Sequence, residues 1–310
     1  MRFMMMIKGD AESELGAMPD EKIVAAMGRY NDALVQAGVF LAAEGLHPTS
    51  KGARLRVTRG QLSVTDGPFA EAREVIAGYW LIRVNSMAEA IAWAERCPLE
   101  PELVAAEPDK VGQIELRQLY ELDDFPANED EVGWRERETA TRADLAIVPP
   151  SAAAPLPVMP DGQPKLKFML MINADKDSEA GIMPSETLLT EMGGLMAEMA
   201  RAGILLGGEG LQPSSAGARI TFAGGKHTVT DGPFTETKEL IAGYSTILVD
   251  SKEEAIAWAT RAILIDAAGR GGESAGEIRQ AFQLSDFAAV LTPELRESEE
   301  RLRAQLAAQQ

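Results

Sequence analysis

The amino-acid sequence predicts an α+β fold built from two similar halves. One observation is a repeated phrase: VTDGPFAEAREVIAGY begins at Val64, and VTDGPFTETKELIAGY begins at Val229. A second is that apolar residues in each copy switch between the two-residue period of strands and the helical period of about 3.6. A third is the length of the chain, because 310 residues are enough for two ordinary domains.

The repeat covers nearly all of each half. Asp66 and Asp231 are 165 residues apart (231 − 66), and the same offset holds without a gap from residue 3 to about residue 97. The segments that end at Phe125 and Phe287 also match, with an offset of 162 (287 − 125), because a loop is shorter in the second copy. A period this long predicts two whole domains rather than a solenoid. We expect domains at 1–125 and 166–287, a linker at 126–165 and a C-terminal helical tail at 288–310.

Both copies predict the same order of elements. In the first copy we expect strands at 2–7, 39–45, 78–84 and 114–122, a hairpin at 54–66, and a helix whose apolar residues recur between Ile23 and Leu34. A second helix is expected after Ser86, which fits a capping box with Glu89. The resulting order, βαβ, hairpin, βαβ, is typical of a ferredoxin-like sheet with its helices on one face.

The first strand of each copy is apolar on both faces, which predicts that both faces are buried. The helices cover only one face of such a sheet. We therefore expect the two copies to pack sheet against sheet about a pseudo-twofold axis. The chain would then be a monomer that contains an intrachain pseudo-dimer, or a higher homo-oligomer of such chains.

The composition excludes several classes of function. A net charge of −18 repels phosphate backbones and anionic lipid, so we expect no nucleic acid and no membrane as partner. Cys97 is the only cysteine, which excludes an intrachain disulfide and a thiolate zinc site and fits a cytoplasmic protein. The apolar run at the N-terminus is too short for a signal peptide or an anchor. No dinucleotide-binding, P-loop or metalloprotease motif occurs, so we expect no cofactor and no metal.

The phrase Asp66-Gly67-Pro68-Phe69 and its repeat at 231–234 resemble the signature of the DGPF, or YCII-related, domain family. The phrases AAEGLHP at 42–48 and GGEGLQP at 207–213 support the resemblance, which leaves only the linker and the tail uncovered. The resemblance implies a dimeric α+β barrel of ferredoxin-like halves. It implies little about activity, because the family is largely uncharacterised. Members of the family are often neighbours of alternative sigma factors, which implies a regulatory partner as one alternative.

The aspartate of the repeated phrase has two interpretations. Asp66 and Asp231 could each be a catalytic acid or base in a cleft beside the sheet. Alternatively, each carboxylate could accept backbone N–H groups in an Asx-turn that ends the hairpin, with Phe69 filling the core. His47 could complement Asp66 in proton transfer. Its counterpart in the second copy is Gln212 (47 + 165), so a symmetric pair of His–Asp sites is not expected.

Two carboxylates and Gln212 are candidate ligand-binding groups. Glu44 and Glu209 each end an otherwise apolar strand, where a carboxylate must be paired, solvated or functional. Arg54 or Arg219 is a candidate partner for them. Both interpretations, a structural ion pair and a binding role, stay open from the sequence.

Tyr79 and Tyr244 follow a glycine at the start of a strand. Each could direct its hydroxyl into a pocket, or could be a buried aromatic residue whose hydroxyl has a partner. Together these candidates favour a small-molecule-binding protein, or a cofactor-independent enzyme that transfers protons as an isomerase or hydrolase does, with a cleft in each half. The alternative is a regulatory interaction module that binds an alternative sigma factor. The sequence does not decide whether the protein is an enzyme.

Overall fold

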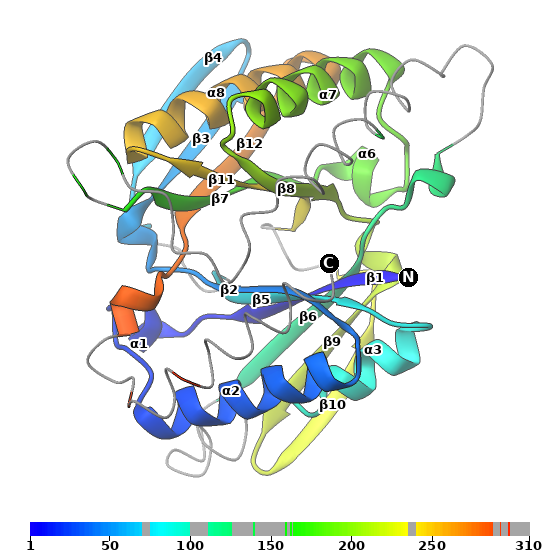
Figure 1. The fold of residues 1–310 in the computed structure, drawn as a ribbon. Coiled ribbons are helices and arrows are strands. Elements are labelled where there is room, and N and C mark those ends of the chain that lie inside the picture. Colours follow the sequence, from blue (N-terminus) through cyan, green and yellow to red (C-terminus); the bar gives the residue numbers. More distant parts are fainter. Residues whose placement is uncertain are drawn as a thin grey trace.

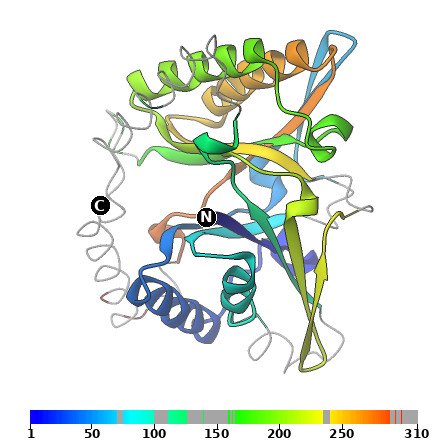
Figure 2. The ribbon, with the colours of Figure 1, turned by 90° about the vertical axis from the view of Figure 1, so that its right-hand side faces the viewer.

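The computed structural model describes residues 1–69, 75–99, 111–125, 164–234 and 240–287, with the single residues 139, 159, 162, 292 and 297. Most of the expected linker (126–165) and of the expected tail (288–310) lies outside these described residues, so the domain limits stay predictions. Two six-stranded antiparallel sheets face each other in the middle of the molecule (Figure 1). The long helices cover the two outer faces, as the turned view in Figure 2 also shows.

The elements repeat in the same order in both halves. The first half contains β1 (Arg2–Lys8), α1 (Ala11–Glu14), α2 (Glu21–Gln36), β2 (Phe40–Gly45), β3 (Gly52–Thr58), β4 (Gln61–Asp66), β5 (Ile76–Arg83), α3 (Met87–Ala94) and β6 (Gly112–Gln118). The second half contains β7 (Leu166–Asn173), α6 (Lys176–Glu179), α7 (Glu186–Arg201), β8 (Leu205–Gly210), β9 (Gly217–Ala223), β10 (Lys226–Asp231), β11 (Ile241–Val249), α8 (Lys252–Gly269) and β12 (Ser274–Gln280). The order confirms the predicted α+β class with two ferredoxin-like halves.

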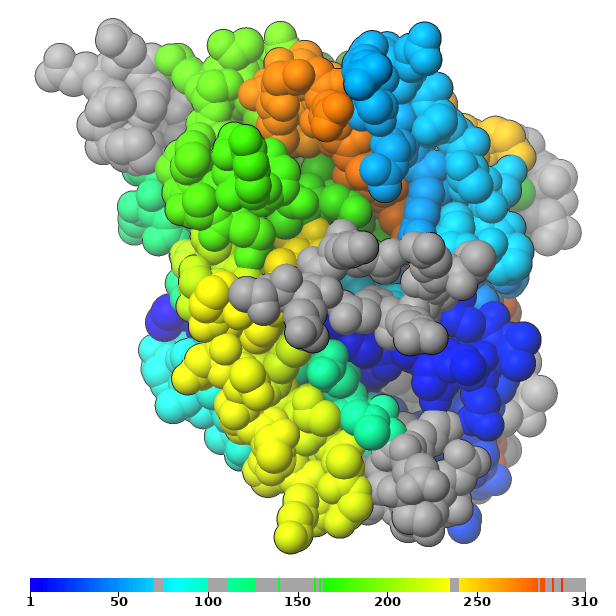
Figure 3. All heavy atoms as spheres, turned by 180° about the vertical axis from the view of Figure 1, so that it is seen from behind, coloured from blue at the N-terminus to red at the C-terminus, as the bar shows by residue number. Residues whose placement is uncertain are grey.

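The sheets do not follow the two halves of the sequence. One sheet has the strand order β10-β9-β6-β1-β5-β2, and the other has the order β4-β3-β12-β7-β11-β8. Each hairpin therefore pairs with the last strand of the other half, β3 with β12 and β9 with β6. Figure 3 shows the blue hairpin β3–β4 beside orange β12 and, below, the yellow hairpin β9–β10. The hairpins were predicted, but their exchange between the halves was not.

The tips of both hairpins have the backbone that a tight turn requires. Arg59 and Gly60 have φ angles of 52° and 76°, and Gly224 and Gly225 have φ angles of 58° and 77°. Two consecutive positive φ angles are typical of the type I′ turn, whose twist matches that of the flanking strands. The tip sequences therefore explain why each hairpin turns where it does.

β1 and β7 are buried on both faces, as predicted. In β1, Phe3 and Met5 pack in the core beneath α2 and α3, whereas Met4 and Met6 belong to a separate core between the two sheets. The core between the sheets also contains these buried residues from both halves: Leu46, Tyr79, Met169, Met171, Leu211 and Tyr244. The second copy thus covers the sheet face that the helices leave open.

The helix that follows β5 begins at the predicted cap. The Ser86 hydroxyl oxygen accepts a hydrogen bond of 3.2 Å from the Glu89 backbone N–H. In a capping box, the Glu89 carboxylate would accept the backbone N–H of the cap residue Ser86. It instead accepts the backbone N–H of Asn85, one residue earlier, at 2.9 Å. The start of α8 repeats both contacts. The serine therefore has its predicted role, and the glutamate fixes the residue that leads into the helix.

The exchanged hairpins predict how an isolated half behaves. Residues 1–125 alone would contain β3 and β4 without the second-half sheet that receives them. We therefore expect this fragment to form a dimer in which two copies exchange hairpins, and sedimentation equilibrium would measure its mass directly. A stable, folded monomer of this fragment would contradict the expectation, and the full chain serves as the control.

Candidate functional site

A cavity of about 750 Å³ lies beside α2 in the first half of the chain. Its walls come from the end of β1, from α1 and α2, and from facing parts of β2 and β5. Among the described residues of the second half, Phe282, Gln283 and Phe287 also line it. Small-molecule sites usually have volumes of roughly 300–1,000 Å³. The cavity therefore has the size of a small-molecule site and is formed where the two halves meet.

Aromatic residues fix part of the cavity wall. The Trp80 indole Nε1 donates a hydrogen bond of 2.7 Å to Asn31 Oδ1, which joins β5 to α2. Tyr30 meets the Trp80 ring edge-on, with ring centroids 5.5 Å apart. Phe282 stacks on His47, with ring centroids 3.9 Å apart. These contacts hold Trp80 and Phe282 in place.

The corresponding region of the second half is built differently. The offset of 165 residues places Met196 where the first half has Asn31, and Ser245 where it has Trp80. The end of the Met196 side chain lies above Gly208 and close to Ser245, and Met196 packs against the core of its half. Residues of different size and polarity thus occupy the positions that frame the cavity in the first half.

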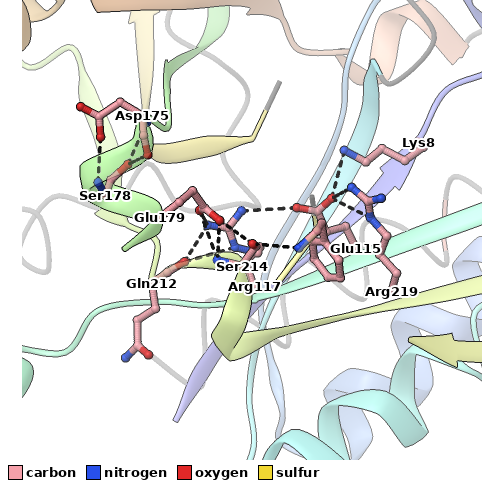
Figure 4. A network of polar contacts seen from close by, with 10 residues as sticks. Lys8, Glu115, Arg117, Asp175, Ser178, Glu179, Gln212, Ser214 and Arg219 are labelled. Carbon is pink, nitrogen blue, oxygen red and sulfur yellow. Dashed lines mark hydrogen bonds and ion pairs between the residues drawn. The ribbon is translucent and has the colours of Figure 1, made fainter. Parts of the chain in front are cut away.

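A network of charged side chains meets the cavity at Lys8 (Figure 4). Glu115 on β6 is almost completely buried and faces Lys8 Nζ at 3.4 Å, Arg117 Nη1 at 3.4 Å and Arg219 Nη2 at 3.0 Å. Burial by itself raises the pKa of the Glu115 carboxyl, but the three cations outweigh burial and lower this pKa below its usual value. Glu115 is therefore charged at neutral pH and holds Lys8 at the cavity.

Two buried arginines join the halves. Arg117 donates from Nε and Nη2 to the carbonyl oxygen of Gln212, at 3.2 and 2.6 Å, and its Nη2 lies 3.2 Å from Glu179 Oε1 (Figure 4). Arg279 binds the carbonyl oxygen of His47 in the same way, at 3.1 and 2.5 Å. Each guanidinium thus binds the backbone of the other half. A hydrogen bond to a charged group of this kind usually contributes about 1.5–3 kcal/mol.

The repeated DGPF phrase contacts the same networks. The Phe69 backbone N–H donates to Thr49 Oγ1 at 3.2 Å, and the Thr49 hydroxyl donates to Glu14 Oε2 at 2.6 Å. The Phe69 ring is buried and lies 4.2 Å from the guanidinium carbon of Arg54, within the range of a cation–π contact. The second copy repeats these contacts, with Ser214 in the place of Thr49. The phrase therefore fixes the chain where it leaves each exchanged hairpin.

The aspartates of the phrase lie at the surface. Asp66 ends β4, its side chain is 72% exposed, and its Oδ1 lies 2.7 Å from Lys252 Nζ at the start of α8. Asp231 ends β10 and is also exposed. Neither is among the described residues that line the cavity. Their role as catalytic acids or bases stays a prediction, and their positions give it no geometric support.

His47 is buried, and its carboxylate partner is Asp286. The His47 Nε2 atom lies 3.2 Å from Asp286 Oδ2 and 3.5 Å from Lys51 Nζ. This contact joins His47 to the other half, and its pairing with Asp66 in proton transfer stays a prediction. Burial and the nearby Lys51 lower the pKa of His47 below its usual value, and Asp286 opposes this change without reversing it. His47 therefore tends to be neutral at neutral pH.

Gln212 has the same place in the second half. Its Nε2 donates a hydrogen bond of 3.1 Å to Asp124 Oδ2. The sequence reasoning missed Asp124 and Asp286, although the matching endings LDDF and LSDF place both aspartates at one position of the repeat. An aspartate that both copies have at one position would have indicated this contact from the sequence. Since glutamine replaces histidine here, this contact joins the halves in both copies without requiring proton transfer.

Glu44 and Glu209 form ion pairs between the halves. Glu44 Oε1 lies 2.5 Å from Lys167 Nζ on β7, and Glu209 pairs with Arg2 on β1. Arg2 also pairs with Glu121, at 2.9 Å. The candidate partners Arg54 and Arg219 instead bind the glutamates of β12 and β6. Glu44 additionally lines the cavity, so its binding role stays open.

Tyr79 and Tyr244 meet between the two sheets. Their ring centroids are 5.9 Å apart, and both side chains are buried. The Tyr79 hydroxyl lies 3.4 Å from Thr246 Oγ1, and burial raises the pKa of Tyr79 well above its usual value. Their rings thus belong to the core between the sheets, although Tyr79 also contributes to the cavity wall.

Within the described parts of the chain, no three His, Cys, Asp or Glu side chains converge as metal ligands would. No helix among the described residues is both long enough and apolar enough to cross a membrane.

Gly67 allows a test of the DGPF phrase. A side-chain carbon at Gly67 would overlap the backbone carbonyl of Thr49, which cannot move aside freely. We expect Gly67→Ala to lower the free energy of unfolding by about 1–3 kcal/mol, as overpacking usually does. Gly207→Ala is the control, because an added carbon there meets no atom within 4 Å. Urea unfolding measures both variants, and equal stability would contradict the close contact.

His47 predicts how stability depends on pH. Its lowered pKa means that the unfolded chain binds this proton more readily than the folded chain, so stability falls as the pH drops through about 6.5. We expect His47→Gln to lose less stability than the native protein between about pH 7.5 and 5.5. Gln212→Ala, which removes the equivalent contact of the second copy without removing a titratable group, is the control and should keep the native pH dependence. An unchanged pH dependence in His47→Gln would contradict the assignment.

Comparison with known proteins agrees with this architecture. Residues 1–106 and 166–270 each match the model of the YCII-related domain. An uncharacterized protein of Rhizobium meliloti (strain 1021) is 33% identical over 110 residues, which are 35% of this chain and 83% of the relative. The relative is thus about as long as one half of this chain. The chain belongs to the YCII-related domain family, whose model matches it twice.

Proposed function

We propose that the protein binds a small organic molecule in the cavity of its first half. The observation that carries the proposal is the difference between the two copies. In the first copy, Trp80 and Asn31 are joined by a hydrogen bond and leave a cavity of about 750 Å³ beside them. In the second copy, Met196 packs over Gly208 in the corresponding place. A cavity wall built from residues that differ in the other copy is consistent with a function in the first copy.

The proposal assigns different tasks to the two halves. The first half supplies most of the cavity wall, and the second half supplies Phe282, Gln283 and Phe287. The second half also fixes Glu44 and the backbone of His47 through Lys167 and Arg279. The second copy would therefore act as a scaffold that completes and stabilises the site of the first copy.

Catalysis by proton transfer is a possible extension of binding at this site. Such chemistry requires an acid or base within hydrogen-bonding reach of the ligand. Lys8, Asp32 and Glu44 line the cavity, whereas Asp66 and Asp231 do not belong to the described lining. Turnover would therefore depend on the lining groups and not on the aspartates of the DGPF phrase.

The regulatory alternative, a complex with an alternative sigma factor, stays a prediction. No contact among the described residues favours it over ligand binding. Recovery of a sigma factor in nearly stoichiometric amount, in a pull-down at physiological salt, would support it. An empty pull-down would count against it.

The glycines of α2 and α7 allow a matched test of the proposal. Gly28 lines the cavity, and a side-chain carbon there would meet no atom within 4 Å. Gly28→Leu should fill the cavity without disturbing the fold. Its counterpart Gly193 (28 + 165) is equally open on α7, so Gly193→Leu is the control.

The measurement is a screen of small organic fragments by thermal shift, followed by calorimetry of the hits with both variants. We expect fragments that bind the native protein to lose at least about tenfold in affinity for Gly28→Leu, about 1.4 kcal/mol, and to retain affinity for Gly193→Leu. Hits that bind both variants equally would place binding elsewhere. A screen without hits on the native protein would contradict the proposed function.

A further inference from the structure

The charges around the cavity are mostly negative. Its lining contains the carboxylates of Asp10, Glu12, Asp20, Asp32 and Glu44. Among the described lining residues, two side chains, Lys8 and Arg29, are cationic. The whole chain has a net charge of −18, so the wider field has the same sign. A concave surface lined by one sign of charge attracts ligands of the opposite sign.

Protein groups already interact with most of these charges. Glu44 forms its ion pair with the second half, and Lys8 is held by Glu115. Asp10 and Asp20 cap the starts of α1 and α2, where their carboxylate oxygens accept backbone N–H groups at 2.8 and 2.9 Å. The charges of these side chains are therefore compensated by groups of the protein, without a ligand.

Asp32 differs from the other lining carboxylates. It is half-buried on α2 and makes no hydrogen bond or ion pair with any residue that the structure describes. The second copy has Ala197 at this position (32 + 165), so the fold does not require a carboxylate there. The Asp32 carboxylate can therefore pair with a cation in the cavity through a charge-assisted hydrogen bond.

The aromatic part of the wall suits the same kind of ligand. Trp80, Phe282 and Phe287 line the cavity, and the rings of Phe282 and Phe287 lie 5.2 Å apart between centroids. Aromatic faces attract cations through their quadrupole and also bury apolar groups. The wall can therefore contact both the charged and the apolar part of an organic cation.

We propose that the ligand is a small amine, protonated at neutral pH, whose ammonium group pairs with Asp32 while its apolar part lies against Trp80 and Phe282. This inference rests on the proposed binding function and adds the chemical class of the ligand. At the positions of Asp32 and Trp80 the second copy has Ala197 and Ser245, so the amine site belongs to the first half alone.

Three probes that share one apolar body test the charge preference. Phenethylamine, phenethyl alcohol and phenylpropionate carry a cationic, a neutral and an anionic end, respectively. Calorimetry on the full chain at neutral pH measures their affinities. We expect the amine to bind at least about tenfold more tightly than the alcohol or the carboxylate, which corresponds to about 1.4 kcal/mol.

A charge-neutral variant locates the contact. Asp32→Asn should weaken phenethylamine about tenfold and leave phenethyl alcohol unchanged, because it removes the charge and keeps the shape. Glu191→Gln is the matched control. It removes one exposed negative charge from α7 and should change neither affinity.

The outcomes separate this inference from the proposed function. Equal or tighter binding of the alcohol or the carboxylate would overturn the amine assignment while leaving ligand binding intact. An unchanged amine affinity in Asp32→Asn would overturn the role of Asp32. Failure of all three probes to bind would also overturn the amine assignment, and the fragment screen with Gly28→Leu decides separately whether the cavity binds ligands.

Discussion

The packing of one sheet against the other is the constraint on which the rest of the structure depends. Met4 and Met6 of β1 meet Met169 and Met171 of β7 in a core that neither half could form alone. Full burial of an apolar side chain of this size contributes roughly 1.5–3 kcal/mol. Methionine also adapts its shape to an irregular gap, which suits a contact between two sheets that are similar and not identical. Because the helices cover the outer faces, the central strands must be apolar on both sides.

Charged residues surround this apolar contact and fix how the halves are placed. Arg117 and Arg279 are almost completely buried, and each binds a backbone carbonyl of the opposite half. A backbone carbonyl cannot change rotamer, so such a bond defines position more sharply than an ion pair between two flexible side chains. The DGPF phrase contributes to the same boundary, because the Phe69 backbone N–H is held by Thr49. Repetition of the phrase thus reflects a structural need that arises once in each copy.

Residue patterns predicted the element order, the two-sided burial of β1 and the packing of sheet on sheet, because each depends on where apolar side chains recur. The exchange of hairpins could not be predicted in this way. A strand that pairs with β12 has the same alternation as one that pairs with β6, since ladder hydrogen bonds involve only the backbone. The site was predictable only in part. Asp66 was a candidate because both copies contain this aspartate. The cavity is instead framed by Asn31 and Trp80, at whose positions the second copy has Met196 and Ser245. The informative signal was the difference between the copies.

The exchange of hairpins also changes what the connection between the halves has to do. Each sheet contains strands from both copies, so the halves would stay interlocked if the connecting segment were cut. Covalent connection makes their association intramolecular, with an effective concentration that does not fall when the protein is diluted. It also ensures that a first copy always meets a second copy and never another first copy. One gene product can therefore maintain a strictly unequal pair, in which the residues that frame the cavity in one member differ in the other.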